Sequence, residues 1–495
     1  MTLPNFSEYV PPGVYWQQQP LPRTVQTTGL PNGVAIVGPS LGYRTYSEAV
    51  TLTSTDPVTL ASNGIIQSSV VVSMNGTVYL KDVDYTLTKI NNTKFPTDPY
   101  SNTTITRIDH SGGIPNGATV TVTYNYTDST YSSPTQVTDY NSAANLYGPS
   151  TDPSDPSAIV SPLSLAAQYA LDNGATEVFL VSVPWSDNTK TAVTASDLLN
   201  GINKLAAQEG VSIVVPLPVG LTGTSGANLI GFATSFSDWL TSEVATNNVF
   251  MMGILGYESG LTFNSNPATN LSKVINNERV VVTYPNNITV YNNNATQTVG
   301  GYYLAAAVAG LMASQPVQDG ITKKNLRDIV GIEAATFNAM TNTYKNSLAA
   351  GGITVVELTR QGMMQVRHGI TTDSSSVYSR EISLVRSRDD MVDTILQSMK
   401  NSGLIGSPIG PNTAATIAGM VNIVLANLEL TGVIAKFSSI SVTERSINPT
   451  IMDVTFVYVP SYPLNYITVT FGIDTSSGSL TGSSTNSTGN ITPAG

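Results

Sequence analysis

The sequence predicts a multidomain protein of mixed α/β and α+β class, and three observations carry this prediction. The middle of the chain alternates helical patterns with short, wholly apolar segments, which is typical of a parallel sheet covered on both faces. Residues 51–135 are rich in Thr, Val and Tyr and contain frequent turn signals, which is typical of an all-β domain. The C-terminal part combines amphipathic helices with alternating strands.

Composition restricts the kinds of partner. The 495 residues carry a net charge of −11, and only 11% of them are charged, against about 25% in average soluble proteins. A surface with so few charges is expected to meet other protein, and its negative sign argues against a nucleic acid or an anionic membrane as partner. The absence of cysteine excludes disulfides, thiolate metal sites and cysteine nucleophiles.

Targeting and membrane segments are not expected. Residues 1–6 have neither a basic segment nor an apolar core, so they do not resemble a signal peptide. The most apolar run, 302–313, is shorter than the roughly 20 residues that span a bilayer.

Residues 1–28 are expected to form an extended N-terminal arm. Prolines flank a short strand candidate at 14–18, which contains Val14, Tyr15 and Trp16. Proline cannot donate to a β-ladder, so such a strand lies at a sheet edge or is added to another sheet. An apolar strand at 33–42 then ends in a turn.

The next region, 51–135, is predicted to be an inserted all-β domain of sandwich type. Asn75-Gly76 lies between two strand patterns and tolerates the positive φ angles of a type I′ hairpin turn. Asn116-Gly117 precedes another strand at 118–126. Because the flanking composition differs on both sides, the domain is expected to be inserted into a surface loop.

Residues 136–299 are predicted to form a parallel-sheet α/β middle domain. Ser161 is placed as an N-cap with Pro162 at the first helical position, and Asn173-Gly174 closes that helix before the apolar strand 178–183. Further helix–strand units are expected at 196–215 and 227–255, and a last strand at 279–284.

Residues 29–50 and 300–475 are expected to form a core domain, followed by a disordered polar tail at 476–495. Helices are predicted at 302–314, 389–400 and 413–430. Ser387 and Asp390 fit a capping box at the start of the second of these. One face of that helix is polar and consists of Asp390, Asp393, Gln397 and Lys400.

Two strands are expected to close the chain, at 451–459 and 466–473. In the first, Val454, Phe456 and Tyr458 alternate with more polar residues, and in the second Ile467, Val469 and Phe471 do the same. An isolated two-stranded unit is marginal in water, so these strands require partners from elsewhere.

The sequence gives weak support for catalytic residues. Gly38-Pro-Ser-Leu-Gly42 matches the G-x-S-x-G nucleophile elbow, which requires a helix directly after Ser40 and a histidine base later in the chain. No helix start follows, and only His110 and His368 are available, so a plain turn is the simpler interpretation.

Cofactor and metal sites are not predicted. The carboxylates at Asp152 and Asp155 lack the spacing of a calcium loop, and Asp389-Asp390 is more simply a helix start favoured by the helix dipole. No glycine-rich phosphate-binding motif occurs.

Several short motifs follow one another in order over most of the chain. They are Pro12-Gly-Val-Tyr15, Val37-Gly-Pro-Ser40, Ala305-Ala-Ala-Val-Ala-Gly-Leu-Met-Ala313, Lys323-Lys-Asn-Leu326, Gly352-Ile353, Gly369-Ile-Thr-Thr372, Arg380-Glu-Ile-Ser383, Val385-Arg386 and the closing strands around Pro460. Together they resemble the tail sheath protein of contractile phage tails and related contractile injection particles.

This resemblance implies a structural, non-enzymatic subunit without cofactors. It would polymerise helically around a tail tube and contract to drive the tube through the host cell envelope. Implied partners are further copies of the chain, the tail tube protein, and the baseplate and tail terminator proteins. The implied location is the contractile tail of a virion, assembled in the host cytoplasm. Two alternatives stay open: another phage structural protein, such as a baseplate or capsid component, or an α/β enzyme with a β accessory domain.

The resemblance also implies contact residues. Intersubunit strand exchange would join Val14, Tyr15 and Trp16 of one copy to the two closing strands of another, which is a form of β-augmentation. The simpler alternative is that the arm pairs within its own subunit. Because the family builds its inner layer from the C-terminal region, the polar face of helix 389–400 is the expected tube-facing surface.

Overall fold

The computed structural model describes residues 29–41, 43–53, 56–63, 65, 67–90, 102–127, 133–152, 155–186, 191–206, 208–221, 227–256, 271–292 and 295–471. The expected arm, with Val14, Tyr15 and Trp16, and the expected tail at 476–495 lie outside the described residues. The chain divides into two compact units, Met1–Pro463 and Leu464–Gly495.

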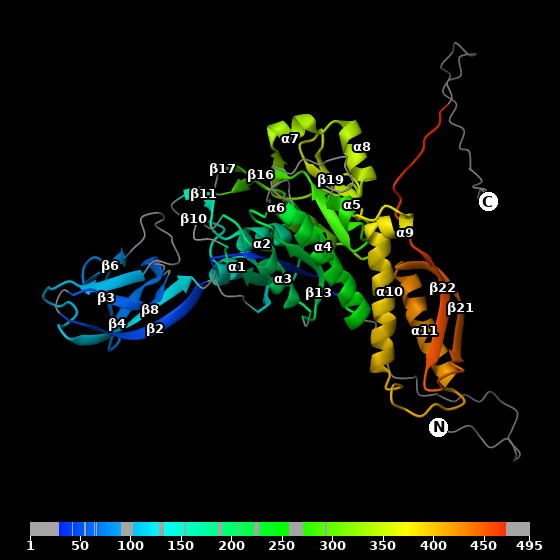
Figure 1. The fold of residues 1–495 in the computed structure, drawn as a ribbon, viewed down its shortest axis with the longest axis horizontal. Helices are drawn as coiled ribbons and strands as arrows, with labels where there is room; N and C mark the ends of the chain where they lie inside the picture. The colour runs from blue at the N-terminus through cyan, green and yellow to red at the C-terminus, as the bar shows by residue number, and fades with distance from the viewer. Residues whose placement is uncertain are drawn as a thin grey trace, which may run out of the picture. The chain divides into compact units, whose positions relative to one another are not determined.

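An eight-stranded sheet organises the first unit (Figure 1). Its six inner strands run parallel, and the two edge strands run antiparallel to their neighbours. In spatial order the strands are β20 (Met364–Val366), β19 (Ile353–Leu358), β15 (Val280–Tyr284), β14 (Met252–Leu255), β13 (Val211–Pro216), β1 (Gly33–Pro39), β12 (Val178–Val183) and β9 (Thr135–Val137).

Helices cover both faces of this sheet, as the wholly apolar strands predict. In β1, Val34 and Ile36 belong to the apolar cluster on one face, and Ala35 and Val37 to the cluster on the other. The first cluster includes α1 (Tyr140–Tyr147), α2 (Pro162–Asp172) and α6 (Gly301–Ala313). The second includes α3 (Ala195–Asn203), α4 (Ala227–Ser242), α5 (Leu271–Ile275) and α8 (Asn342–Ala350). A π-helical turn, Glu243–Asn247, follows α4.

The sheet crosses the domain boundaries expected from the sequence. Strands β1 and β19 come from the expected core domain, yet β1 lies between β12 and β13 of the expected middle domain and β19 pairs with β15. The physical reason is that β1 is buried throughout and therefore requires parallel neighbours on both sides. The helix caps at Ser161 and at Asn173-Gly174 are confirmed.

Two antiparallel sheets form the β module, and their side chains share one apolar core. The first contains β2 (Tyr43–Leu52), β8 (Ala118–Thr127), β4 (Val71–Met74) and β5 (Thr77–Tyr79). The second contains β3 (Val58–Asn63), β7 (Asn102–Arg107) and β6 (Tyr85–Ile90), and a 3-10 turn at Gln67–Ser69 precedes β4. The hairpin at Asn75-Gly76 is confirmed, with φ angles of 50° and 83°. The module begins at Tyr43 rather than at 51, because β2 pairs along its whole length with β8.

Smaller elements complete this part of the chain. A three-stranded sheet consists of β17 (Ala295–Gly300), β16 (Asn287–Asn292) and β18 (Ile329–Ile332), and a two-stranded one of β10 (Thr151–Asp152) and β11 (Asp155–Ile159). The short helices α7 (Ala334–Ala339) and α9 (Val377–Arg380) lie in the connections.

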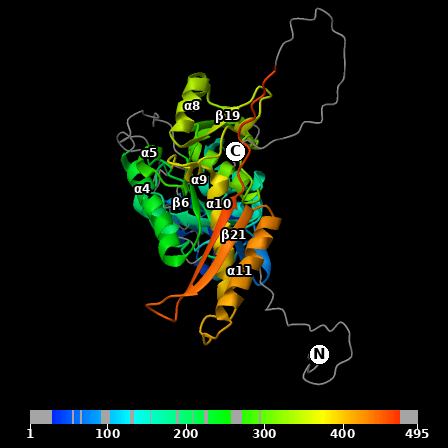
Figure 2. The ribbon, with the colours of Figure 1, turned by 90° about the vertical axis from the view of Figure 1, so that its right-hand side faces the viewer.

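The C-terminal part of the first unit consists of two long helices and a two-stranded sheet. They are α10 (Ile382–Asn401), α11 (Thr413–Leu430), β21 (Ile434–Glu444) and β22 (Met452–Pro460). Figure 2 shows α11 beside β21, and these elements share an apolar cluster that also receives Leu30. Helix α11 has the expected bounds, and it buries one apolar stripe, which consists of Ile417, Met420, Val421, Val424, Leu425 and Leu428.

Among the described residues, α11 is the helix that is long and apolar enough to cross a membrane, judged by length and composition alone. A core helix that packs against other elements meets the same criterion, and the buried stripe of α11 packs against α10 and β21.

Candidate assembly site

The open two-stranded sheet is the first candidate site. The expected strand at 451–459 is confirmed as β22, and Val454, Phe456 and Tyr458 pack against the cluster formed with α11. On the opposite face Val457 and Val459 are exposed. Neither outer edge of the sheet is paired with another strand in the described part of the chain.

The intrachain partner of β22 was missed by sequence reasoning. Strand β21 shifts register between Ser438 and Ser441, where Ser439 has a φ angle of 57°, and again between Ile434 and Lys436. In both places β21 carries the extra residue, so it is bulged while β22 runs without interruption. These bulges break the alternation of apolar and polar residues that identifies a strand in a sequence.

The described part of the second expected closing strand (466–473), residues 466–471, is not a strand in the single chain. Residues 461–471 carry no strand, and Ile467, Val469 and Phe471 are between 77% and 79% exposed. Apolar and polar residues alternate in this segment as they do in strands. A strand also requires a neighbouring strand whose backbone groups can hydrogen-bond to its own N–H and C=O groups. Before this segment begins, Ser461 donates to the carbonyl of Gly432.

Helix α10 is longer than expected and begins at Ile382 rather than at 389. The expected capping box at Ser387 and Asp390 is therefore wrong, because both residues lie inside the helix and are buried. The expected helix start at Asp389-Asp390 is wrong for the same reason. Buried polar side chains in this part of α10 obscure the apolar stripe that would reveal its first turns.

The expected tube-facing residues have different environments. Asp390 is 4% exposed and accepts a 2.6 Å hydrogen bond from the backbone N–H of Leu30, so it makes an intrachain contact that the polar pattern of the helix did not indicate. Asp393 and Gln397 are half-buried and hydrogen-bonded to each other, and Lys400 is exposed. Of the polar face, the part from Asp393 to Lys400 remains accessible.

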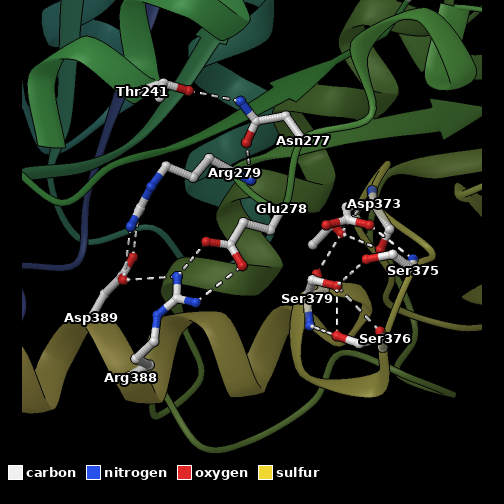
Figure 3. A network of polar contacts seen from close by, with 11 residues as sticks. Thr241, Asn277, Glu278, Arg279, Asp373, Ser375, Ser376, Ser379, Arg388 and Asp389 are labelled. Carbon is white, nitrogen blue, oxygen red and sulfur yellow. Dashed lines mark hydrogen bonds and ion pairs between the residues drawn. The ribbon is translucent and has the colours of Figure 1, made fainter. Parts of the chain in front are cut away.

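Two ion pairs connect α10 to the large sheet (Figure 3). Arg279, directly before β15, reaches Asp389 with Nη1–Oδ2 and Nη2–Oδ1 distances of 2.6 and 3.0 Å. Its neighbour Glu278 accepts two hydrogen bonds from Arg388, at 2.7 and 3.0 Å. Two adjacent residues directly before β15 thus contact two adjacent residues of α10. Sequence reasoning missed this network. The only local signal of it in the sequence is the run of charged residues at 386–390.

Burial and charge act on the pKa values of this helix in different directions. Burial lowers the pKa of Arg386 to about 10, although the nearby Asp390 carboxylate opposes the change. Burial also acts to lower the pKa of Arg388, but hydrogen bonds to Glu278 and the charge of Asp389 outweigh it and raise that pKa. Burial raises the pKa of Asp390, against the effect of its bond from Leu30.

The weak catalytic candidate, Ser40, lies in the connection between β1 and β2. Ser40 follows β1, and the next element is β2, so no helix follows the serine. The Ser40 hydroxyl lies 2.6 Å from that of Ser182, and its carbonyl accepts from the indole of Trp185. These contacts give Ser40 a structural place beside β12.

The two histidines each contact a carboxylate. His368 Nε2 lies 2.9 Å from Glu381, and His110 Nε2 lies 2.7 Å from Asp84. Within the described residues no three His, Asp or Glu side chains gather in a way that would hold a metal ion.

Comparison with known proteins agrees with this architecture. No family model matches the sequence. The tail sheath protein of Mycobacterium phage Bxz1 is 28% identical over 436 residues, covering 85% of this chain and 71% of that protein. The contracted helical sheath of the anti-feeding prophage matches with a TM-score of 0.55 at 14% identity, over 94% of this chain and all of that one.

A second sheath has a similar fold. The contracted sheath complex of the extracellular contractile injection system PVC matches with a TM-score of 0.53 at 12% identity, over 94% of this chain and 99% of that one. In fold, this chain is therefore similar to the subunits of contractile sheaths. The more particular resemblance expected from the sequence, to the tail sheath proteins, is confirmed by the mycobacteriophage relative.

Proposed function

We propose that copies of this chain polymerise helically around a tail tube by exchanging strands through the β21–β22 sheet. The observation that carries the proposal is an open sheet in a chain that also exposes an alternating apolar segment. Strand β22 offers a regular free edge, and Ile467, Val469 and Phe471 have no strand partner within the described residues. A two-stranded sheet is marginal in water, and added strands stabilise it.

The two edges of the sheet are not equivalent. A bulge hinders the pairing of a strand edge with an added strand. The bulge at Ser439 lies in the middle of β21. Strand β22 has no such interruption, so Val454, Phe456 and Tyr458 lie on the edge strand that is better suited to an incoming strand.

The donated strands come from the two ends of the chain. We assign them to the segment with Val14, Tyr15 and Trp16 and to the segment with Ile467, Val469 and Phe471, each pairing with a neighbouring copy. A contact between different surfaces of identical subunits forms a ring when its rotation closes and an open helix when it does not, and the proposed assembly is the helix.

We assign contact with the tail tube to the accessible part of α10. Asp393, Gln397 and Lys400 lie on one side of the helix at a spacing of three and four residues. Exposed polar contacts are individually weak, so they can hold the sheath on the tube and still release it subunit by subunit. Asp390 is withdrawn from this surface because it is buried.

The remaining assignments concern the position of the β module, the other partner proteins and the location of the protein. The β module from Tyr43 to Thr127 is placed on the sheath exterior, since it has its own core. Baseplate and tail terminator proteins are the partners at the two ends of the sheath, and the contractile tail of a virion, assembled in the host cytoplasm, is the location. In this role the chain is not an enzyme.

Removal of residues 1–19 tests the proposal. The concentrated full-length chain should form long hollow cylinders in negative-stain microscopy, and the truncated chain should not. The truncated monomer should unfold at the same temperature as the full-length one, since every described core residue is retained. Cylinders formed by the truncated chain would refute strand exchange through the arm. Absence of cylinders from the full-length chain would favour a baseplate or capsid role.

Cysteine cross-linking separates exchange between subunits from pairing within one. The chain has no cysteine, so Val14→Cys combined in turn with Thr455→Cys, Val457→Cys and Val459→Cys gives an unambiguous readout. Exchange between copies predicts a ladder of oxidised multimers on a non-reducing gel. Pairing within a subunit predicts an oxidised monomer of altered mobility.

A further inference from the structure

The N-terminal end of the described chain is fixed to the middle of α10. The backbone N–H of Leu30 donates to Asp390 Oδ1 at 2.6 Å, across 360 positions of sequence. Gly29 lies so close that a Cβ atom there would be 3.0 Å from the same oxygen. The Leu30 side chain packs against the apolar cluster shared by α10, α11 and the C-terminal sheet.

A second contact holds the same segment one helical turn away. Arg386 Nη2 donates to the side-chain oxygen of Asn32 at 3.3 Å, while its Nη1 donates to the carbonyl of Met312 in α6 at 2.9 Å. Arg386 and Asp390 are four residues apart on α10, so they lie on the same side of the helix. Residues 29–32 are therefore held at two points.

Helix α10 joins this segment to the rest of the first unit. Its residues Arg388 and Asp389 bind the pair Glu278 and Arg279 at the large sheet. Its residue Met391 belongs to the apolar cluster against which β21 and β22 pack. The point where the N-terminal segment enters and the sheet that offers a free edge are thus attached to one helix.

We infer that Asp390 is a positioning residue that fixes the exit of the N-terminal arm on α10. A pull on the arm then acts on α10, and through it on the C-terminal sheet, instead of peeling residues 29–32 from the body. In a polymer whose subunits are linked by their arms, a moving subunit pulls on the arm of its neighbour. If the arm is fixed firmly where it leaves the body, the pull moves the whole neighbouring subunit. This inference rests on the proposed strand exchange for its consequence, but the anchor itself can be tested in the isolated chain.

The test compares two substitutions of similar shape. Asp390→Asn keeps a side-chain oxygen that can accept from Leu30, and Asp390→Leu has none. Asp393→Leu is the control, because Asp393 lies on the same helix and is bonded to Gln397 rather than to the N-terminal segment. Gly29→Val is a second way to dislodge the segment, since its side chain would meet the Asp390 carboxylate without altering the buried side of α10.

Hydrogen–deuterium exchange of the peptide containing residues 29–33 measures the anchor. Asp390→Leu and Gly29→Val should accelerate exchange at Leu30 by roughly tenfold or more, the change expected when a hydrogen bond to a charged acceptor is lost. Asp390→Asn should accelerate exchange there less than Asp390→Leu, since a neutral acceptor remains, and Asp393→Leu should leave the rate near that of the wild type. Equal protection in Asp390→Leu and wild type would overturn the anchor.

Electron microscopy measures the consequence. Gly29→Val and Asp390→Leu should still form cylinders, since the arm strand is intact, but tails that carry them should show partly contracted sheaths where wild-type tails contract along their whole length. Complete contraction with an accelerated Leu30 amide would overturn the transmitting role alone. Absence of cylinders in the wild type would instead count against the proposed function.

Discussion

Arg279 and Asp389 form a buried bidentate ion pair between residues 110 positions apart. The guanidinium is 8% exposed and the carboxylate 3%. Each charge is removed from water and compensated mainly by the other, with the Phe250 ring 5.9 Å from the guanidinium. Such a pair holds two elements in a defined relation, because sliding either one would leave a charge buried without its partner.

Breaking this pair from one side should destabilise the fold strongly. Arg279→Ala or Asp389→Ala should each lower the free energy of unfolding by about 3 to 5 kcal/mol, measured by urea unfolding. The double variant Arg279→Met/Asp389→Leu should cost much less than the sum of the two single changes. Loss of the exposed Arg445–Asp453 pair is the control and should change the midpoint little. Additive effects at 279 and 389 would contradict the coupling.

Stability should fall on acidification because of Glu357. Burial acts to raise the pKa of Glu357, but hydrogen bonds from Lys345, Lys323 and Arg367 outweigh it and lower that pKa to about 2. As pH falls below the ordinary value of 4.5, the unfolded chain takes up a proton before the folded chain does, so folding stability declines between about pH 4.5 and 2.

Urea unfolding at low protein concentration across this pH range checks the effect. Glu357→Gln should remove part of the decline, whereas Glu444→Gln, at an exposed position on β21, should not. An unchanged pH dependence in Glu357→Gln would show that the three cations do not depend on this carboxylate.

The β module should be removable at the boundaries seen in the structure. A chain in which a flexible linker replaces residues 43–127 should keep the cooperative unfolding of the large sheet, since the module buries its own core. A deletion of 51–135 should instead aggregate, because it leaves most of β2 without β8 and removes Thr135 from β9. Circular dichroism and gel filtration distinguish the two outcomes. Unfolding of the large sheet in the first variant would show that the module supports it.

Charge changes on α10 should separate folding from tube binding. Asp393→Lys combined with Lys400→Glu should leave thermal unfolding nearly unchanged and reduce assembly on the tube. Asp390→Lys should lower the unfolding temperature even in the absence of the tube, because it places a second cation near the buried Arg386 and removes the acceptor of Leu30. Normal tail assembly by the 393/400 variant would remove these residues from the tube-facing surface.

Much of the architecture could be predicted from local pattern. The strand at 178–183, the helices at 162–172 and 413–430 and the hairpin at Asn75-Gly76 were identified because their periodicity, caps and turn residues act over a few neighbouring positions. The resemblance to tail sheath proteins followed from the order of short motifs. The exposed alternation of Ile467, Val469 and Phe471 was also visible, although composition could not supply its partner strand.

Tertiary structure alone decided which segments meet. No local pattern places β1 between β12 and β13 or extends α10 back to Ile382, because these outcomes depend on contacts across long stretches of chain. The charged residues of α10 show this most clearly. The polar face of an isolated helix predicts exposure, but Asp389 and Asp390 are buried because Arg279 and the N–H of Leu30 meet them there. Burial of a charge is determined by its partner, and only the folded chain brings that partner within reach.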